Sequence, residues 1–303
     1  MARRRRVLSE AEHRERRRRD RERLEAALTE LMTSDGWKRW LRTRAVLHHY
    51  SWRNTLLIAS QCRLRGIEAT CVAGFRAWLK LGRCVRRGET GLKIWAPMTV
   101  KVTVEDDDGR EAVERRTIFR IAKVFDVSQT DPLPDTEPAP LAPPGAAPIE
   151  GDSHAHLLDP LQCLARTLGY RVEWVDSLDG LALGTCDRRR KVIRVRRTLA
   201  ANMRVSVLIH ELCHALVGHA GHRLAYDAEE VAVEAATFVA CSAAGLATDV
   251  SSVPYVAGWA RQDDAIERLQ RLATLVDAPA GAIEQAIADD DRKQEPGSQP
   301  QAA

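Results

Sequence analysis

A proline-rich segment divides this sequence of 303 residues into two parts. Residues 131–148 read DPLPDTEPAPLAPPGAAP and show no periodic apolar pattern. Proline has no amide hydrogen and a fixed φ, so such a run predicts an extended, semi-rigid linker. We therefore expect five segments: an Arg-rich arm (1–23), a first domain (24–130), the linker (131–150), a second domain (151–289) and a disordered tail (290–303).

The two parts carry opposite net charge. Met1–Thr130 hold 30 Lys and Arg against 17 Asp and Glu, a net charge of +13, whereas the remaining residues hold 16 against 25, a net charge of −9. The first part therefore suits a polyanionic partner such as a nucleic acid, and the second part does not. Some of the basic excess lies in the first 23 residues, which could form either a solvated helix or a disordered arm.

Composition argues against several classes of protein. No apolar run approaches the roughly 20 residues that a membrane span needs, and the N-terminus has no apolar stretch typical of a secretory signal. The seven cysteines are scattered and never form a CxxC pair, so neither a disulfide framework nor a thiolate zinc site is indicated. We expect a cytoplasmic protein that does not contact a membrane, and the oligomeric state stays open.

The segment LIHELCHALVGHAG, at 208–221, contains a possible metal motif. Dense apolar residues between Asn202 and Val217 predict a mostly buried helix, which Gly218 could end. His210 and His214 then lie one turn apart on one face, with Glu211 beside them. This HExxH spacing is typical of zinc peptidases: the ion lowers the pKa of a water to roughly 7, and the carboxylate accepts its proton. The alternative is a chance pair of core histidines.

A third metal ligand is expected from the following helix. The metzincin pattern would need Gly at 217 and His at 220, but the sequence has Val217 and Ala220. The segment DAEEVAVEAATFVACSAAGL instead offers Glu230 and Glu234 on one helix face. Its string VEAATFVA resembles the glutamate-bearing helix of the gluzincin peptidases. That resemblance implies Glu234 as the third Zn²⁺ ligand, with Glu230 orienting a histidine.

Two further features of the second domain bear on a peptidase. RRRKVIRVRRTL, at 188–199, alternates apolar and basic residues as a half-exposed strand does. In zincin-like peptidases an edge strand pairs with an extended substrate, so this segment is a candidate, although a sheet edge protected by charge fits equally well. Candidate donors to an oxyanion are His219, His222, Tyr226 and Tyr255, and the sequence does not choose among them.

Four motifs of the first domain occur in a characteristic order: YSWRNTLLIASQ (50–61), GFRAW (74–78), LGRCVRRGETGLKIWAP (81–97) and VFDVSQTD (124–131). They resemble the N-terminal single-stranded-DNA-binding domain of the ArdC-type antirestriction proteins, whose C-terminal domain is peptidase-like and carries HExxH. The resemblance implies an α+β protein of two domains, a basic α+β domain that binds single-stranded DNA and a zincin-like metallopeptidase domain. It also implies protection of incoming DNA from restriction.

The same motifs interleave aromatic, amide and basic residues, a mixture that suits stacking on bases and binding of phosphates. The DNA-binding candidates are Tyr50, Ser51, Arg53, Asn54, Arg76, Trp78, Arg83, Arg86, Arg87 and Lys93. The aromatic residues could belong to the domain core instead. The acidic segment VEDDDGREAVERR (104–116) predicts a hairpin with a turn at Asp108 and Gly109 that faces away from nucleic acid.

The sequence is compatible with three functions. The first is a DNA-binding antirestriction protein with an active zinc peptidase, in which Glu211 is the general base and a protein is the substrate. The second is a DNA-binding protein whose zinc domain is structural. The third is a peptidase that cleaves a regulator and is activated by single-stranded DNA.

Overall fold

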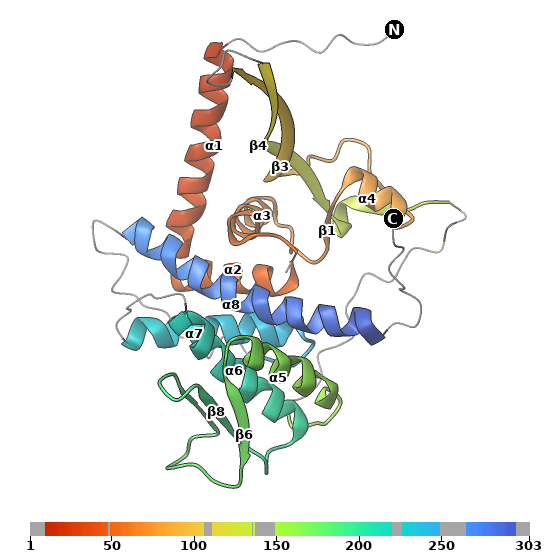
Figure 1. Cartoon of the computed structure of the whole chain (residues 1–303). Helices are drawn as coiled ribbons and strands as arrows, with labels where there is room; N and C mark the ends of the chain where they lie inside the picture. The colour runs from red at the N-terminus through yellow and green to blue at the C-terminus, as the bar shows by residue number, and fades with distance from the viewer. Residues whose placement is uncertain are drawn as a thin grey trace. The chain divides into compact units, whose positions relative to one another are not determined.

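The computed structural model describes residues 10–47, 49–105, 111–134, 136, 149–219, 226–248 and 265–294, and it has a mixed α+β fold (Figure 1). Contacts between Cα atoms divide the chain into two compact units. Unit 1 comprises Met1–Trp52 and Ala142–Ala303, and unit 2 comprises Arg53–Leu141. Within the described residues, none of the helices combines the length and the apolar character that a membrane crossing requires.

The packing differs from the expected domains at residues 24–52, which belong to unit 1, whereas the unit boundary between Leu141 and Ala142 falls inside the expected linker. The N-terminal helices α1 (Glu10–Leu31) and α2 (Ser34–Val46) belong to unit 1, because α2 buries Trp37 and Trp40 completely and packs against α7. The Arg44 guanidinium, 2% exposed, also forms ion pairs with Asp277 at 2.5 Å and Glu284 at 3.0 Å. The basic excess is therefore split, with a net charge of +7 in residues 1–52 and +6 in residues 53–130. The division of function between residues 24–130 and 151–289 stays a prediction.

The expected terminal and linker segments are only partly described. The Arg-rich arm is helical from Glu10, where α1 begins, and exposed ion pairs join Glu15 to Arg18 and Arg19. At the other end α8 runs to Gln294, so the first residues of the expected disordered tail are helical. Residues 295–303 lie outside the described part, as do residues 135 and 137–148 of the linker.

Unit 1 combines helices with a small sheet. Its sheet has the order β6-β8-β7, in which β8 runs parallel to β6 and antiparallel to β7. In chain order after α2, its elements are η2 (Ala155–Leu157), α5 (Leu158–Thr167), β6 (Arg171–Val175), β7 (Gly184–Asp187), β8 (Val192–Arg196), α6 (Ala201–His219), α7 (Tyr226–Ala243) and α8 (Ala265–Gln294). Helices α5, α6, α7 and α8 pack together (Figure 1).

The expected edge strand within residues 188–199 is instead the central strand β8. Val192, Ile193 and Val195 are fully buried, as a central position requires. The basic residues that suggested an exposed edge bond to neighbouring segments: Arg194 pairs with Glu173 of β6 at 2.9 Å, and Arg196 donates to the Gly180 carbonyl at 2.9 Å. The strand that packs beside α6 at the sheet edge is β7.

Helix α6 confirms the buried helix expected over residues 202–217, and it continues past Gly218. A Cβ atom at Gly218 would lie 2.6 Å from Nε of Arg188. The glycine therefore admits the Arg188 side chain against the helix; it does not end the helix.

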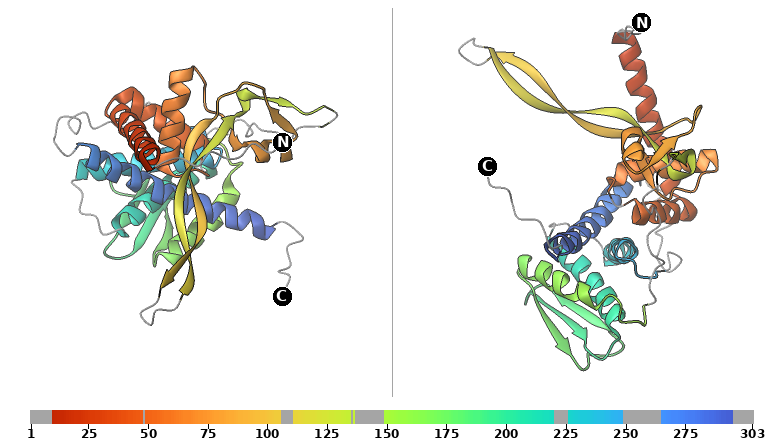
Figure 2. Two further views of the ribbon diagram at one scale, coloured as in Figure 1. Left: turned by 90° about the horizontal axis from the view of Figure 1, so that it is seen from above. Right: turned by 90° about the vertical axis from the view of Figure 1, so that its right-hand side faces the viewer.

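Unit 2 is built on a three-stranded antiparallel sheet, β1-β4-β3, and a two-stranded pair, β2-β5. Its elements are α3 (Trp52–Arg65), β1 (Val72–Gly74), α4 (Phe75–Lys80), β2 (Arg83–Val85), β3 (Leu92–Glu105), β4 (Glu111–Asp126), η1 (Val127–Gln129) and β5 (Thr130–Pro132). Strands β3 and β4 continue beyond β1 as a long twisted ribbon (Figure 2). The acidic hairpin expected from the sequence is the far end of this ribbon, where Glu105 pairs with Glu111; its turn at Asp108 and Gly109 lies outside the described residues.

Candidate functional site

Helices α6 and α7 bring two histidines and one glutamate together. His210 and His214 lie one turn apart on α6, with their ring centroids 4.9 Å apart. Glu230 on α7 approaches them, and its Oε1 is 3.7 Å from Nε2 of His214. One ligand atom from each of the three residues lies within 4.8 Å of the others. Two imidazoles and a carboxylate at this separation match the donor set of a catalytic divalent ion.

The two candidate glutamates of α7 lie beside different histidines. Glu234, the expected third ligand, lies with its Oε1 3.8 Å from Nδ1 of His210, where Thr237 Oγ1 also lies at 3.5 Å. Glu230, which was expected to orient a histidine, supplies the carboxylate of the group whose ligand atoms lie within 4.8 Å of one another. The two residues are one turn apart on the same face of α7, so the sequence spacing did not distinguish them. Metal coordination by either residue stays a prediction.

Glu229 and Arg188 both contact His214, and neither residue was predicted from the sequence to do so. Oε1 of Glu229 lies 3.4 Å from Nδ1 of His214, and Glu229 is paired with Arg188. Arg188 also donates from Nε to the His214 carbonyl at 3.1 Å. Burial alone would raise the pKa of Glu229, but hydrogen bonds and charge from Arg188 hold it below its ordinary value. The Glu–Glu doublet at 229–230 was the only sequence signal for this contact.

Burial sets the protonation of the other polar groups. It lowers the pKa of His210 to about 4, with His214 adding to the effect, so the His210 ring is neutral near pH 7 and able to bind a metal. Burial raises the pKa of Glu211 to about 8, with the charge of Glu230 adding to it. A cation among these residues would favour the ionised carboxylate.

These groups line a cavity of about 700 Å³ whose wall includes Gly184–Arg189. Strand β7 approaches Glu211 closely, since a Cβ atom at Gly184 would lie 2.8 Å from its Oε1. The arrangement places a sheet edge beside a buried carboxyl and the candidate metal ligands. Among the expected oxyanion donors, His222 and Tyr255 lie outside the described residues, and the side chains of His219 and Tyr226 are likewise not described.

Two of the expected DNA-binding residues are engaged inside unit 2. Trp78 is fully buried and donates from Nε1 to the Phe125 carbonyl at 2.9 Å. The Asn54 side chain donates to the Trp95 carbonyl at 2.8 Å and accepts from the Trp95 amide at 2.9 Å. Gln61, two turns later on α3, makes the same two bonds with Lys93, each at 2.9 Å. Asn54 and Gln61 therefore satisfy the backbone groups of Trp95 and Lys93 at one edge of β3.

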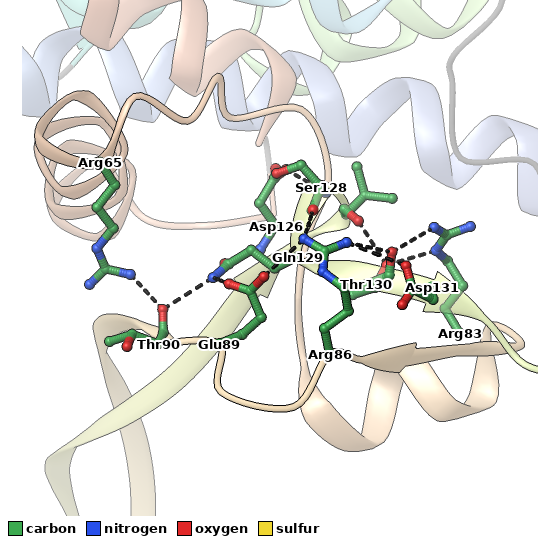
Figure 3. A network of polar contacts seen from close by, with 11 residues as sticks. Arg65, Arg83, Arg86, Glu89, Thr90, Asp126, Ser128, Gln129, Thr130 and Asp131 are labelled. Carbon is green, nitrogen blue, oxygen red and sulfur yellow. Dashed lines mark hydrogen bonds and ion pairs between the residues drawn. The ribbon is translucent and has the colours of Figure 1, made fainter.

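Two of the expected arginines join the motifs to one another (Figure 3). Arg83 donates to the Thr130 hydroxyl at 2.8 Å and to its carbonyl at 3.2 Å. Arg86, which is 41% exposed, contacts Ser128, Glu89 and Asp131. The segments LGRCVRRGETG and VFDVSQTD thus form one polar network within unit 2.

The remaining candidates divide between the units. Arg53, Arg76 and Arg87 are exposed residues of unit 2, and Lys93 is half-buried on β3. Tyr50 and Ser51 belong to unit 1, where they line a cavity of about 690 Å³ together with residues of α8. Within unit 2 the expected residues therefore divide between the core, the polar network of Figure 3 and the exposed surface, and their part in DNA binding stays a prediction.

Residues 22–127 match the model of the N-terminal domain of the anti-restriction factor ArdC. The chain is also 26% identical over 275 residues to an uncharacterised Bacillus anthracis protein, an overlap of 79% of this chain and 45% of that protein, so it spans less than half of that relative. The metal-free structure of the antirestriction protein ArdC from the R388 plasmid has a TM-score of 0.49 at 21% identity, and its Mn(II)-bound structure has 0.47 at 20%. Each covers 79% of this chain and 86% of the other.

The chain thus combines a region similar to the N-terminal domain of an anti-restriction factor, at residues 22–127, with a candidate metal centre.

Proposed function

We propose that this protein is an antirestriction protein that binds single-stranded DNA through unit 2 and hydrolyses peptide bonds at a metal centre in unit 1. The DNA-binding part is supported by the family match over residues 22–127 and by the exposed arginines of unit 2. The peptidase part is carried by one observation: His210, His214 and Glu230 meet beside the buried Glu211.

The donor set fits a divalent metal. His210 and His214 would supply imidazole nitrogens, and Glu230 a carboxylate oxygen. Zn²⁺ is the expected ion because two histidines and a glutamate are a common catalytic zinc set, although imidazole and carboxylate ligands also suit other first-row ions such as Mn²⁺. When bound, the ion supplies Lewis acidity, which activates water and polarises a carbonyl.

The residues of the chain would then perform the proton transfers and hold the substrate. Glu211 accepts a proton as the oxygen of water bonds to the peptide carbon, and it returns the proton to the leaving nitrogen as the C–N bond breaks. Strand β7 forms one wall of the cavity, and its edge could pair with an extended substrate chain. Glu229 and Arg188 keep the His214 ring in its orientation.

The test compares full-length protein with its Glu211→Gln variant. Metal content after dialysis against Zn²⁺ or Mn²⁺ should be equal in the two proteins, since Glu211 is not among the proposed ligands. Cleavage of unfolded casein, measured with and without single-stranded DNA, should fall by about 10²- to 10⁴-fold in the variant. Equal cleavage by the variant would exclude Glu211 as the general base.

A DNA-transfer assay with the same pair separates the two activities. If the variant still protects incoming DNA from restriction as well as the wild type does, protection comes from DNA binding and not from hydrolysis. If the variant loses both protection and casein cleavage, antirestriction depends on the peptidase site.

A further inference from the structure

We propose that single-stranded DNA binds along one face of the β3–β4 ribbon, and this inference rests on the proposed DNA-binding function. We call it the ribbon face. It consists of three cross-strand pairs: Lys93 with Lys123, Trp95 with Ile121, and Pro97 with Phe119.

The register places these six residues on the same side of the ribbon. Side chains alternate between the two faces of a strand, and residues directly opposite each other in an antiparallel pair share a face. The intervening residues Leu92, Ile94 and Val124 are buried, so the opposite face is the core side at the base of the ribbon. The open part of the ribbon face begins after the buried Phe125 and continues outward from Lys123.

The charge of the ribbon face fits a polyanion. Lys93 and Lys123 lie directly opposite each other in the register, so two basic side chains share one position of this face. None of the six residues is acidic, and Lys123 is exposed. A phosphate bound beside the two lysines would gain from both charges.

The apolar residues of the same face fit bases. The Phe119 side chain is 62% exposed, and Trp95, two positions away in register, is half-buried. Successive positions on one face of a strand are about 7 Å apart, which leaves room for a base beside each ring. Aromatic rings next to basic side chains are the usual arrangement of single-strand sites.

Single strands fit this face better than duplex DNA. A two-stranded ribbon can enter the major groove of a duplex, but there it reads base edges by hydrogen bonds. Phe119, Pro97 and Ile121 offer no side-chain donor or acceptor, whereas they present apolar surface, including the flat Phe119 ring, to unstacked bases.

The opposite face of the ribbon provides matched controls. Met98, 40% exposed, and Arg120, also exposed, lie one position from Phe119 along the register but point to the other side. Full-length variants Phe119→Ala, Phe119→Leu and the double variant Lys93→Gln/Lys123→Gln are therefore compared with Met98→Ala and Arg120→Gln. Thermal melting of each variant checks that the fold is retained.

Binding is measured by fluorescence anisotropy with a labelled dT20 oligonucleotide and with a labelled duplex, over a range of NaCl concentrations. We expect Phe119→Ala to weaken dT20 binding about 5- to 150-fold, and Phe119→Leu to weaken it less, because leucine keeps apolar area but cannot stack. The lysine double variant should lower the slope of log K against log salt by about 1.4, or about 0.7 for each lost phosphate contact. The controls should bind within about twofold of the wild type.

The outcomes separate this inference from the function on which it rests. No dT20 binding by the wild type would overturn the DNA-binding function itself. Wild-type binding that the ribbon-face variants retain would overturn only the ribbon face. If these variants lose duplex binding and keep dT20 binding, the single-strand assignment is wrong.

Discussion

The polar motif residues of unit 1 and those of unit 2 differ in what their side chains contact. In unit 1, His210, His214 and Glu230 bring their ligand atoms within 4.8 Å of one another at a cavity wall. In unit 2, Asn54 and Trp78 direct their polar atoms to main-chain groups of neighbouring strands. Side chains that converge on one point form a site, whereas side chains that match backbone donors and acceptors hold a fold together.

The difference has a physical cause. A helix satisfies most of its own backbone hydrogen bonds, so its polar side chains are not needed for that purpose. Histidine and glutamate side chains within the apolar helix α6 are nevertheless costly to bury unless they gain a partner. A strand leaves backbone groups unpaired along its open edge, and these groups need partners from elsewhere. Asn54 and Gln61 supply them for β3, and they account for part of the motif YSWRNTLLIASQ.

The largest effect should come from Arg44, which tests whether the N-terminal helices belong to unit 1. Arg44→Ala leaves Asp277 and Glu284 partly buried without their cation, so the free energy of unfolding should fall by about 3–5 kcal/mol. Urea denaturation followed by tryptophan fluorescence, to which the buried Trp37 and Trp40 of α2 contribute, measures the change. Arg42→Ala, at an exposed position of the same helix, is the control and should change stability little. An unchanged unfolding midpoint for Arg44→Ala would contradict the assignment of α2 to unit 1.

A smaller effect is expected from Glu229, which tests whether the polar groups of unit 1 act as one site. Glu229→Gln removes the charge beside Nδ1 of His214, so metal affinity should fall by about 10- to 100-fold. Competition with a chromogenic chelator for Zn²⁺ gives the affinity, and the visible spectrum of bound Co²⁺ reports the geometry. Glu173→Gln is the matched control, because Glu173 also pairs with arginines but lies on β6. Equal affinities for all three proteins would show that Glu229 does not support the metal centre.

The sequence predicted the local pattern of unit 1 better than its topology. The helix carrying His210 and His214 follows from apolar periodicity, and its bounds agree closely with the expected ones. The position of β8 inside its sheet did not follow, because basic residues on a strand fit both an exposed edge and ion pairs with a neighbouring strand. The choice between Glu230 and Glu234 depends on how α7 is placed against α6, and residues one turn apart share a face in either case.

In unit 2 the motifs identified the domain but not the part that each residue plays. Composition alone cannot distinguish an amide that contacts a base from one that bonds to a strand edge, since both need the same donor and acceptor. Arg83 and Arg86 show the same ambiguity, because a guanidinium that could bind phosphate instead contacts Thr130, Ser128 and two carboxylates. Long-range packing decides between these roles, and it was absent from the sequence patterns.

The smallest effect separates a structural from a DNA-binding role for Asn54. Asn54→Ala removes both hydrogen bonds to Trp95, so the free energy of unfolding should fall by about 1–3 kcal/mol. The affinity of the folded variant for dT20 should stay within about twofold of the wild type. Arg53→Gln, at the exposed neighbouring position, should change stability little and therefore serves as the control for the mutated helix.

The free energy of unfolding and the affinity for dT20 together distinguish the two roles of Asn54. If Asn54→Ala weakened dT20 binding at unchanged stability, the amide would contact DNA. The structural role assigned to Asn54 in unit 2 would then be wrong. If stability fell and binding also fell in proportion to the unfolded fraction, refolding the variant with an osmolyte should restore binding. Restoration would assign Asn54 to the edge of β3, because a lost DNA contact cannot be recovered by stabilising the fold.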